Sequence, residues 1–300
     1  MAIKRLKSET AVAAFLQEYK SLLKVSSPGH PNIIQTIAAE VREDTNAKHG
    51  SIQRFGFIFP LALGNLKELF RGSLETIAPI EAKVDSLWGE FEGLASAVEY
   101  LHKHCRMVHR DIKPSNILVY DDLSLSGLKA KITDFGLAID FEHVKVFNPG
   151  TKELQSAVDY DAPELRRRLQ GEDSGQRKPP TEKESSSGDI WKLGAVWVEL
   201  VTYLILGSHG VSDFRKFITV TEGNLKSDTL TRFDDGVRVK PEVLEWLKSL
   251  STRSPRATEM ELLLKKMLDN ADSRPDASEV VARMRLVSAV KSGLGTHAYT

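Results

Sequence analysis

Three side chains suited to transferring a group lie within one short stretch, residues 109–116, which read HRDIKPSN. Asp111 has a carboxylate that can accept a hydroxyl proton, Lys113 an ammonium that can face a phosphate, and Asn116 an amide that can hold a metal ion. The stretch by itself also fits a surface turn, because Asp, Lys, Pro, Ser and Asn are common loop residues. What lies downstream separates the chemical interpretation from the turn.

Two tripeptides follow in order, DFG at residues 134–136 and APE at residues 162–164. Together with residues 109–116 they resemble, in order and approximate spacing, the catalytic-loop, Asp-Phe-Gly and Ala-Pro-Glu motifs of the protein kinases. A single tripeptide can occur by accident, whereas three in order rarely do. Lys113, two residues after Asp111, is typical of serine/threonine kinases rather than tyrosine kinases of this family. Arg110 and the APE motif favour a protein substrate over a small molecule.

The resemblance implies a role for each polar side chain. Phosphoryl transfer requires the γ-phosphate of ATP, the metal ions and the acceptor hydroxyl to be held in line, with the negative charge neutralised. Asp111 would accept or orient the substrate hydroxyl, and Lys113 would stabilise the transferred group. Asn116 and Asp134 would bind Mg²⁺, a hard cation that prefers oxygen ligands. The alternatives are a turn-capping carboxylate at Asp111 and an Asx turn at Asn116.

The resemblance reaches the start of the chain. Lys4 resembles the lysine of a small-lobe strand that contacts the α- and β-phosphates of ATP, and Glu18 is its expected partner on the following helix. Surface lysines and glutamates are common, so two unrelated surface charges are the alternative. With Leu118 expected beside the nucleotide, the predicted nucleotide-binding residues are Lys4, Glu18, Leu118 and Asp134.

Two more contacts are implied further along the chain. Glu164 is expected to form a buried, structural ion pair with Arg274. Arg110 is expected to receive a phosphate placed on the segment between Asp134 and Glu164. The available acceptors in that segment are Thr151, Ser156 and Tyr160. Ordinary loop polarity explains these three residues equally well.

The chain departs from the family pattern in two places. The motif G-x-G-x-x-G, a loop that lies over the ATP phosphates in the family, does not occur in the 300 residues, and the strands expected before Lys4 are missing. Ser156-Ala157 stand where a Gly-Thr pair is usual, unless an insertion lets Gly150-Thr151 supply it. We therefore expect weak ATP binding and slow turnover from this chain. A naturally truncated kinase and a fragment of a longer one both fit.

Apolar periodicity, together with the resemblance, predicts a single protein kinase-like domain of the α+β class. We expect a bilobal fold with a truncated β-rich small lobe and a mainly helical large lobe. The expected division of the chain 1–300 is 1–59 for the partial small lobe, 60–64 for the hinge, 65–290 for the large lobe, 170–188 for a flexible insertion and 291–300 for a tail.

The elements that must position the polar residues follow from the same patterns. A hairpin is expected to carry Asp134 to the site, and a long amphipathic helix to lead into the catalytic loop. An apolar helix, with Asp189, Trp191 and Gly194 matching a family signature, is expected at the centre of the large lobe. The predicted strands are 2–6, 33–40, 52–59, 117–120 and 130–133, and the predicted helices are 10–25, 84–101 and 190–206.

Composition excludes some classes of protein. The 41 basic and 41 acidic residues balance, so no global charge favours nucleic acid or an anionic membrane. The lone Cys105 cannot form an intrachain disulfide and is expected to be a packed thiol in a reducing compartment, cytosol or nucleus. Residues 190–206 are short for a membrane span and carry Lys192 and Glu199. Residues 1–7 lack the apolar run of a secretory leader.

Two functions remain open on these grounds. The first is a protein kinase-like domain that transfers the γ-phosphate of ATP to serine or threonine hydroxyls of a protein, with Mg²⁺ as cofactor. The rival is a catalytically impaired pseudokinase that acts as a binding or scaffolding module. The complete catalytic set favours the first, and the missing glycine-rich loop favours the second. A third, minor alternative is an enzyme acting on small-molecule hydroxyls. Neither the substrate nor the oligomeric state is indicated.

Overall fold

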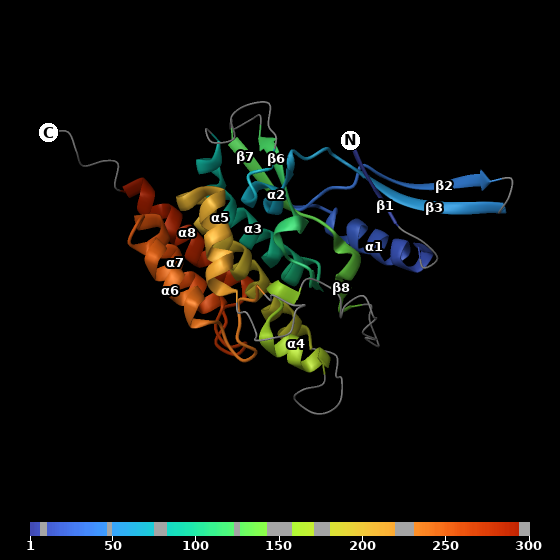
Figure 1. The fold of residues 1–300 in the computed structure, drawn as a ribbon. Helices are drawn as coiled ribbons and strands as arrows, with labels where there is room; N and C mark the ends of the chain where they lie inside the picture. Colours follow the sequence, from blue (N-terminus) through green and yellow to red (C-terminus); the bar gives the residue numbers. More distant parts are fainter. Residues whose placement is uncertain are drawn as a thin grey trace, which may run out of the picture.

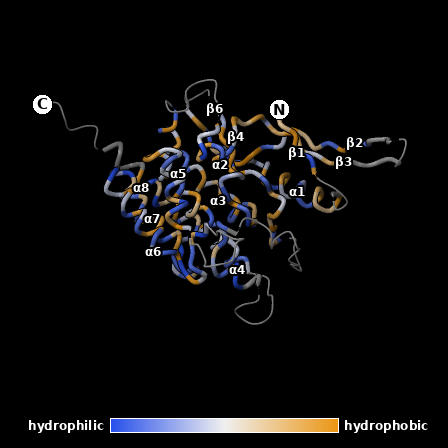
Figure 2. Tube along the Cα trace, in the orientation of Figure 1, coloured by the Kyte–Doolittle hydropathy of each residue, from blue (hydrophilic) through white to orange (hydrophobic). Residues whose placement is uncertain are grey.

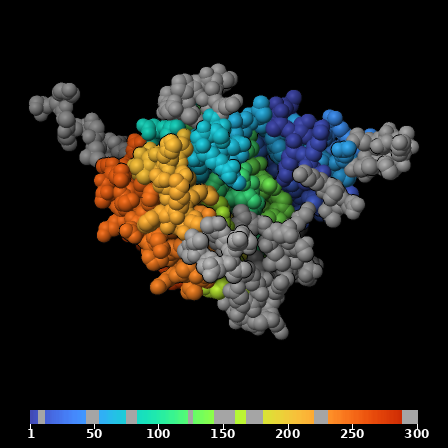
Figure 3. All heavy atoms as spheres, in the orientation of Figure 1, coloured from blue at the N-terminus to red at the C-terminus, as the bar shows by residue number. Residues whose placement is uncertain are grey.

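The computed structural model describes residues 1–6, 11–46, 50–74, 83–122, 127–142, 158–170, 181–219 and 231–293. Figure 1 shows a β-rich N-terminal region with one helix beside a larger, mostly helical region. Residues from the middle of the chain lie on the surface between the two regions (Figure 3). This arrangement confirms the predicted α+β class.

The N-terminal region is a three-stranded antiparallel sheet in the order β1-β3-β2, with helix α1 packed on one face. Phe57 of the central strand stacks on Phe15 of α1, with ring centroids 4.9 Å apart, and both rings are buried. The apolar residues of α1 recur every three or four positions, which gives the helix one face for the sheet. The elements are β1 (Ala2–Arg5), α1 (Ala11–Val25), β2 (Ala38–Asn46) and β3 (Gly50–Phe59).

The predicted strand at residues 33–40 is correct only for its last three residues, 38–40. Strand β2 begins only at Ala38 and continues to Asn46. Ile33 instead forms an isolated bridge with Ile132 of the helical region, and its side chain is 1% exposed. A β-branched, apolar run suggests a strand, but this one is buried by packing against the second region rather than by pairing in the first sheet.

Residues 60–63 connect the two regions without regular structure, within the predicted hinge at 60–64. The next residues form the short strand β4 (Gly64–Asn65), which pairs with β6 of a second sheet in the order β4-β6-β7. Asn65 also caps helix α2 (Leu66–Phe70), because its side chain accepts from the N–H of Glu68 while the Glu68 carboxylate accepts from the N–H of Asn65. This reciprocal cap defines where the helical region begins.

The predicted amphipathic helix before residues 109–116 is present. Glu90 on this helix accepts the backbone N–H of Ala130 at 2.9 Å and the side-chain amide of Asn32 at 2.6 Å, which ties the helix to the predicted hairpin. The elements of this part are the 3₁₀ turn Val84–Ser86, α3 (Leu87–Glu99), the π-helical turn Tyr100–His104, β5 (Met107–Val108), the 3₁₀ turn Pro114–Asn116, β6 (Ile117–Asp122), β7 (Gly127–Ile132), the 3₁₀ turn Phe135–Leu137 and β8 (Ile139–Asp140).

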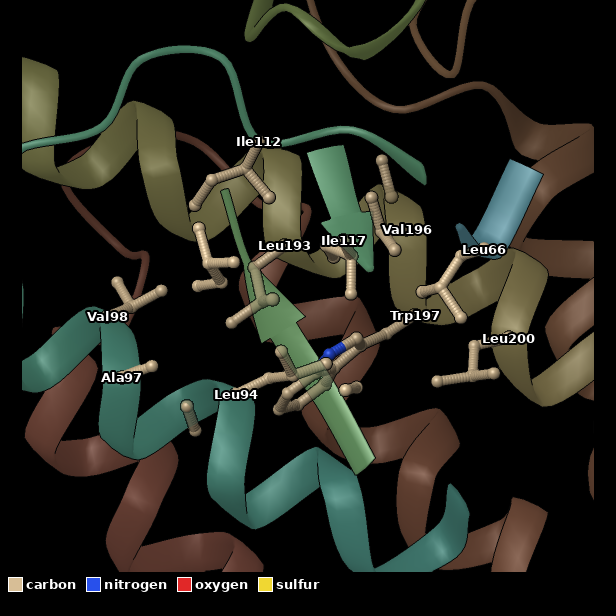
Figure 4. Packing of buried hydrophobic residues seen from close by; sticks show 14 of the residues in the cluster. Leu66, Leu94, Ala97, Val98, Ile112, Ile117, Leu193, Val196, Trp197 and Leu200 are labelled. Atoms are coloured by element: carbon tan, nitrogen blue, oxygen red, sulfur yellow. The ribbon is translucent and has the colours of Figure 1, made fainter. Parts of the chain in front are cut away.

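Helix α5 (Glu182–Ile218) forms the core of the helical region, as the apolar stretch predicts, and Gly207 interrupts it with a left-handed φ of 68°. Trp197 of α5 is fully buried and meets the ring of Phe91 edge-on, with centroids 5.0 Å apart. Figure 4 shows Trp197 and Leu193 packed between α5 and Leu94 of α3. The central helix thus presents large side chains to the helix that leads into the catalytic loop.

By length and composition, α5 is the single helix of the described residues that could cross a membrane. Within its most apolar window, 72% of the residues are buried inside the protein, as in a core helix. Its buried Lys192 and Glu199 form ion pairs with Asp161 and Arg215. The length of α5 is therefore a weak indication of a membrane span.

The predicted flexible insertion at 170–188 is too long at both ends. Gln170 still belongs to the helix after the APE motif, and residues 182–188 form the first turns of α5. Thr181 and Glu184 make a reciprocal capping box there, a signal that polar composition concealed. Residues 171–180, which precede Thr181, lie outside the described residues.

The remaining helices pack against α5 or, in the case of the C-terminal one, mainly against α3, and they alternate between hydrophobic and hydrophilic residues along their length (Figure 2). The predicted tail at 291–300 starts too early, because α8 extends through residue 293, and residues 294–300 lie outside the described part. These helices are α4 (Pro163–Gln170), α6 (Pro241–Ser251), α7 (Pro255–Met267) and α8 (Ala277–Gly293).

The predicted ion pair between Glu164 and Arg274 is confirmed, with Nη1 and Oε1 2.8 Å apart. The Arg274 side chain is fully buried, whereas that of Glu164 is 23% exposed. Arg274 also donates to the backbone carbonyls of Ser187 and Asp269 and lies over the ring of Trp191. This arginine therefore joins α4, α5 and the segment before α8.

Glu164→Ala should lower the free energy of unfolding by about 3 kcal/mol, the lower end of the range for a broken buried pair, because Arg274 keeps its carbonyl acceptors. The double variant with Arg274→Leu should recover part of this loss, since no guanidinium is left unpaired. Urea unfolding of both single variants and the double variant measures the coupling.

The matched control is Glu182→Ala, which removes an exposed partner of Arg106 and should cost less than about 1 kcal/mol. Strictly additive effects of the Glu164 and Arg274 substitutions would contradict the assigned pair.

Candidate active site

A buried carboxylate of α5 holds the turn that presents residues 109–116. Asp189 accepts the backbone N–H groups of His109 and Arg110, each at 2.8 Å, and lies 3.0 Å from Nε2 of His102. Arg110 has a left-handed φ of 69°, which costs a non-glycine residue about 1–2 kcal/mol. Burial alone would raise the pKa of Asp189, but His102, together with His109, brings the pKa below its ordinary value. The ionised carboxylate offsets the backbone strain.

His109 connects this turn to the loop that carries the DFG motif. Its Nδ1 accepts the N–H of Asp111 at 3.2 Å, so Nε2 carries the proton and donates to the carbonyl of Thr133 at 3.0 Å. The ring meets that of Phe135 edge-on, with centroids 5.0 Å apart, and both are fully buried. His109 therefore sets the spacing between Asp111 and Asp134.

The structure brings Asp111, Lys113 and Asn116 into direct contact. Lys113 Nζ lies 2.9 and 2.8 Å from the two carboxylate oxygens of Asp111. The side-chain amide of Asn116 donates to Oδ2 and to the backbone carbonyl of Asp111, at 2.8 and 2.9 Å. The 3₁₀ turn that starts at Pro114 brings Asn116 back over the aspartate. These donors orient a carboxylate that is 7% exposed.

A backbone reversal at Asp134 turns its carboxylate toward the N-terminal region. Its φ of 67° and ψ of 77° lie in the left-handed region, and its Oδ1 accepts the N–H of Gly136 at 3.4 Å. The N–H of Thr133 donates to the carbonyl of Asn116 at 2.9 Å, which extends the pairing of β6 with β7. Asn116 and Asp134 thus lie at adjacent ends of one hairpin, the arrangement expected of two metal ligands.

Lys4 bridges the two regions of the protein. Its ammonium lies 2.6 Å from Glu18 on α1 and 2.8 Å from Asp134. Burial alone would lower the pKa of Lys4, but Asp134 and Glu18 raise it above its ordinary value. Burial would raise the pKa of Asp134, but the charge of Lys4 holds it below its ordinary value. Burial raises the pKa of Glu18, and Lys4 offsets part of that effect.

Leu118 lies partly buried on β6, opposite Asn65 of β4 and Lys131 of β7. The neighbouring Val119 accepts the N–H of Leu63 from the connection between the two regions, at 2.9 Å. Leu118 is therefore at the junction where a nucleotide base is expected, and its contact with the base stays a prediction.

The residues predicted to bind Mg²⁺ have suitable chemistry. Asp134 is 40% exposed, and its lowered pKa keeps it ionised at neutral pH. Asn116 adds an amide oxygen, because its nitrogen is the atom that donates to Asp111. Among the described residues, no cluster of three or more His, Cys, Asp or Glu side chains could hold a metal. A site with one carboxylate and one amide suits Mg²⁺ when phosphate oxygens complete its coordination.

The prediction that Tyr160 is available as a phosphate acceptor is wrong. Its hydroxyl donates to Glu199 at 2.6 Å and also contacts Arg215, and the residue is 5% exposed. The other two candidates, Thr151 and Ser156, lie outside the described residues, as do Gly150 and Ala157. The buried Cys105 agrees with a packed thiol.

Sequence reasoning missed the contacts that support the loops. Asp189 was recognisable as part of a motif, but its hydrogen bonds to His102 and to the loop backbone were not predicted. Lys192 pairs with Asp161 just before the APE motif. The available signal was the presence of charges inside an apolar helix, since a buried charge needs a partner. That signal identifies the buried member but not its distant partner.

Asp189→Asn should destabilise the protein by about 3 kcal/mol near neutral pH, because an amide cannot accept from all three donors. The pKa of Asp189 is lower in the folded than in the unfolded state, so its contribution is complete above the ordinary value of 3.8 and declines as the pH falls through the folded pKa. The difference between wild type and variant in urea unfolding should therefore be constant from about pH 7 to about pH 5 and narrow below about pH 4.

Asp272→Asn is the matched control, because that side chain is 98% exposed, and it should leave stability unchanged. A difference between wild type and Asp189→Asn that grows in acid would contradict the assigned ionisation.

Comparison with known proteins extends the likeness beyond the motifs. The chain is similar to the serine/threonine-protein kinase/endoribonuclease ireA of Aspergillus fumigatus, 29% identical over 210 residues that cover 63% of this chain and 18% of that protein. It is 34% identical over 136 residues to a calcium/calmodulin-dependent protein kinase kinase of Caenorhabditis elegans, covering 45% and 21%. It is 28% identical over 207 residues to human mitogen-activated protein kinase kinase kinase 4, covering 67% and 11%.

The chain thus spans between 11% and 21% of the length of these relatives. The family described as the protein kinase domain matches residues 1–284, nearly the whole chain. That range includes both halves of the site, from Lys4 on its strand to the Glu164–Arg274 pair. This chain therefore belongs to the eukaryotic-type protein kinase family.

Proposed function

We propose that this domain transfers the γ-phosphate of ATP to serine or threonine hydroxyls of a protein substrate. The supporting observation is one continuous set of contacts, from Glu18 through Lys4 to Asp134, beside the cluster at Asp111. The relatives described above are all named as kinases. The presence of a lysine, Lys113, two residues after Asp111 supports the serine/threonine class.

Asp111 would orient the acceptor hydroxyl and take its proton as the new bond forms. Its carboxylate is held by the ammonium of Lys113 and the amide of Asn116, so its direction is set before the substrate arrives. Such preorganisation saves the cost of ordering the group during the reaction. The ammonium of Lys113, held against Asp111, would neutralise charge that develops on the transferred group.

Lys4 would contact the nucleotide phosphates from the other side of the site. The Glu18 side chain is 3% exposed, and its carboxylate binds the ammonium of Lys4. Movement of α1 would therefore move Lys4. Mg²⁺, when bound with ATP by Asp134 and Asn116, would supply positive charge to the phosphate oxygens. The charge of Lys4 and the ionised Asp134 are both in place before nucleotide binds.

One observation favours the rival function, a pseudokinase that binds without turnover. Lys4 contacts Oδ1 of Asp134 at 2.8 Å, an oxygen suited to a metal ion. If this ion pair persisted with ATP present, the metal would lose a ligand and the domain would act as a binding module. The metal dependence of nucleotide binding therefore discriminates between the two functions.

Asp111→Asn should lower turnover by about 10²–10⁴-fold, because general-base and orienting contributions are of that size. ATP affinity should change little, since Asp111 is assigned to the hydroxyl. Transfer of labelled phosphate to a generic protein substrate measures the first quantity and calorimetry the second. Asp272→Asn, on an exposed side chain, should retain the wild-type rate. An Asp111→Asn variant with most of the wild-type rate would remove this role.

Mg²⁺ should increase the thermal stabilisation by ATP, whereas Mg²⁺ without ATP should have little effect. Asp134→Asn should abolish the Mg²⁺-dependent part, because the carboxylate is the charged ligand of the pair. A thermal-shift series with ATP, with Mg²⁺ and with both measures this. Equal stabilisation by ATP with and without Mg²⁺ would favour the binding module.

A further inference from the structure

Strand β2 forms an open edge of the N-terminal sheet. The strand order is β1-β3-β2, and within the described ranges β2 pairs only with β3. Figure 1 shows the β2–β3 hairpin extending past α1, away from the helical region. An edge strand has backbone N–H and C=O groups that point away from its neighbour and can pair with another strand. The free side of β2 is therefore a place where a further strand can add.

This edge lacks most of the usual protection against pairing. Proteins protect exposed edges with short strands, with proline or with charges, lysine above all. Strand β2 has nine residues, AAEVREDTN, without proline or lysine. Its charged residues have both signs, so they repel a second strand in some registers and attract it in others. The sequence of β2 thus selects a partner strand instead of excluding every one.

The two faces of β2 carry different side chains. Val41 is opposite Phe55 of β3, whose ring centroid lies 5.0 Å from that of Phe15, so Val41 is on the face that α1 covers. The residue is nevertheless 56% exposed. Its neighbours Glu40 and Arg42 are on the opposite, outward face, because successive side chains of a strand alternate. Val41 therefore leaves apolar surface beside the free edge.

Glu40 and Arg42 form an ion pair along the strand. Nε of Arg42 donates to Oε2 of Glu40 at 3.0 Å, and the side chain of Arg42 is 59% exposed. The outward face thus presents one negative and one positive group, two residues apart, next to the free edge. A strand with the opposite order of charges would complement both groups.

A second copy of β2 supplies that opposite order. A two-fold axis perpendicular to the sheet pairs two copies of β2 antiparallel and keeps the same face of each copy on the same side. One residue of β2 is then opposite its own copy. With Val41 at this centre, Glu40 is opposite Arg42 of the second copy, and Arg42 is opposite Glu40 of the second copy. The four groups alternate in sign around the axis, so each lies next to two opposite charges.

Other centres are less favourable. Among the residues of β2 whose side chains are described, centring on Glu40, Arg42 or Glu43 would place a charge opposite its own copy, which destabilises a sheet. Centring on either alanine of the strand would forgo both charge pairs. Val41 at the centre also brings two exposed apolar side chains together across the axis, which removes part of their surface from water. The charges and the valine therefore favour the same register.

We propose that β2 is an interaction surface for a second copy of this chain, with Val41 opposite its own copy. The two three-stranded sheets would then form one antiparallel sheet of six strands. Backbone pairing would hold the copies together, and the side chains would set the register. The proposal is independent of the proposed kinase activity, because β2 and β1, the strand of Lys4, form opposite edges of the sheet.

Sedimentation equilibrium of the full chain over a range of concentrations tests the proposal. Wild type should show a reversible equilibrium between monomer and dimer. Val41→Asp, at an exposed position, should weaken the dimer by about tenfold or more, because it places two carboxylates opposite each other at the axis. Arg42→Glu should weaken it similarly, since both cross-strand charge pairs become repulsive.

A charge exchange tests the register itself. Glu40→Lys makes both residues of the ion pair positive, and Arg42→Glu makes both negative, so each variant alone should associate weakly. An equimolar mixture of the two variants should form a dimer about as stable as that of wild type, because every cross-strand charge pair in it has opposite signs. Recovery in the mixture also shows that both variants fold.

The matched control is Arg253→Glu, which reverses the charge of an exposed residue after α6 and should leave dimer formation unchanged. A wild-type chain that stays monomeric at every concentration would overturn the proposal. A dimer that Val41→Asp and Arg42→Glu leave intact would place the contact elsewhere and overturn it as well. So would a mixture of the two charge variants that associates no better than each variant alone.

Discussion

The buried carboxylate of Asp189 is the constraint on which the active site depends. It is fixed on the central helix α5 and accepts two consecutive backbone N–H groups of the catalytic loop, at His109 and Arg110. These contacts stabilise the left-handed conformation of Arg110, and the next residue is Asp111. Burying a carboxylate costs free energy, and breaking any of its hydrogen bonds would leave a buried polar group unpaired, so the loop has one preferred geometry. The position of Asp111 therefore follows from the packing of α5.

From that fixed loop, the site is assembled by a hydrogen bond and a series of ion pairs. His109 joins the catalytic loop to Thr133, Asp134 contacts Lys4, and Lys4 contacts Glu18 on α1. The N-terminal region thus reaches the helical region through a salt bridge as well as through packing. The Lys4 and Asp134 side chains are 32% and 40% exposed, so this salt bridge is worth about 1 kcal/mol or less, and it joins the two regions at the point where phosphoryl transfer would occur. Movement of α1 would displace Glu18 and Lys4 and so change the contact of Lys4 with Asp134.

The two faces of the N-terminal sheet carry different side chains. Alternation along β1 sends Lys4 to one face of the sheet and Arg5 to the other. The inner face places one lysine between two carboxylates, whereas Arg5, Arg42 and Arg54 lie on the outward face.

The sequence by itself determined the family, the α+β class and the local groupings. Asp111, Lys113 and Asn116 are close in the chain, so their contact follows from one turn and could be predicted, as could the Lys4–Glu18 pair through the family resemblance. The predictions failed where a residue in a local sequence pattern contacts a residue that is distant in the chain. Residues 33–37 look like a strand, but Ile33 forms an isolated bridge with Ile132, and Tyr160 looks available, but it is buried and donates to Glu199. The bonds of Asp189 and the convergence of three arginines depend on strand register and helix packing. Only the tertiary structure decided these, because they join residues whose separation along the chain bears no relation to their distance in space.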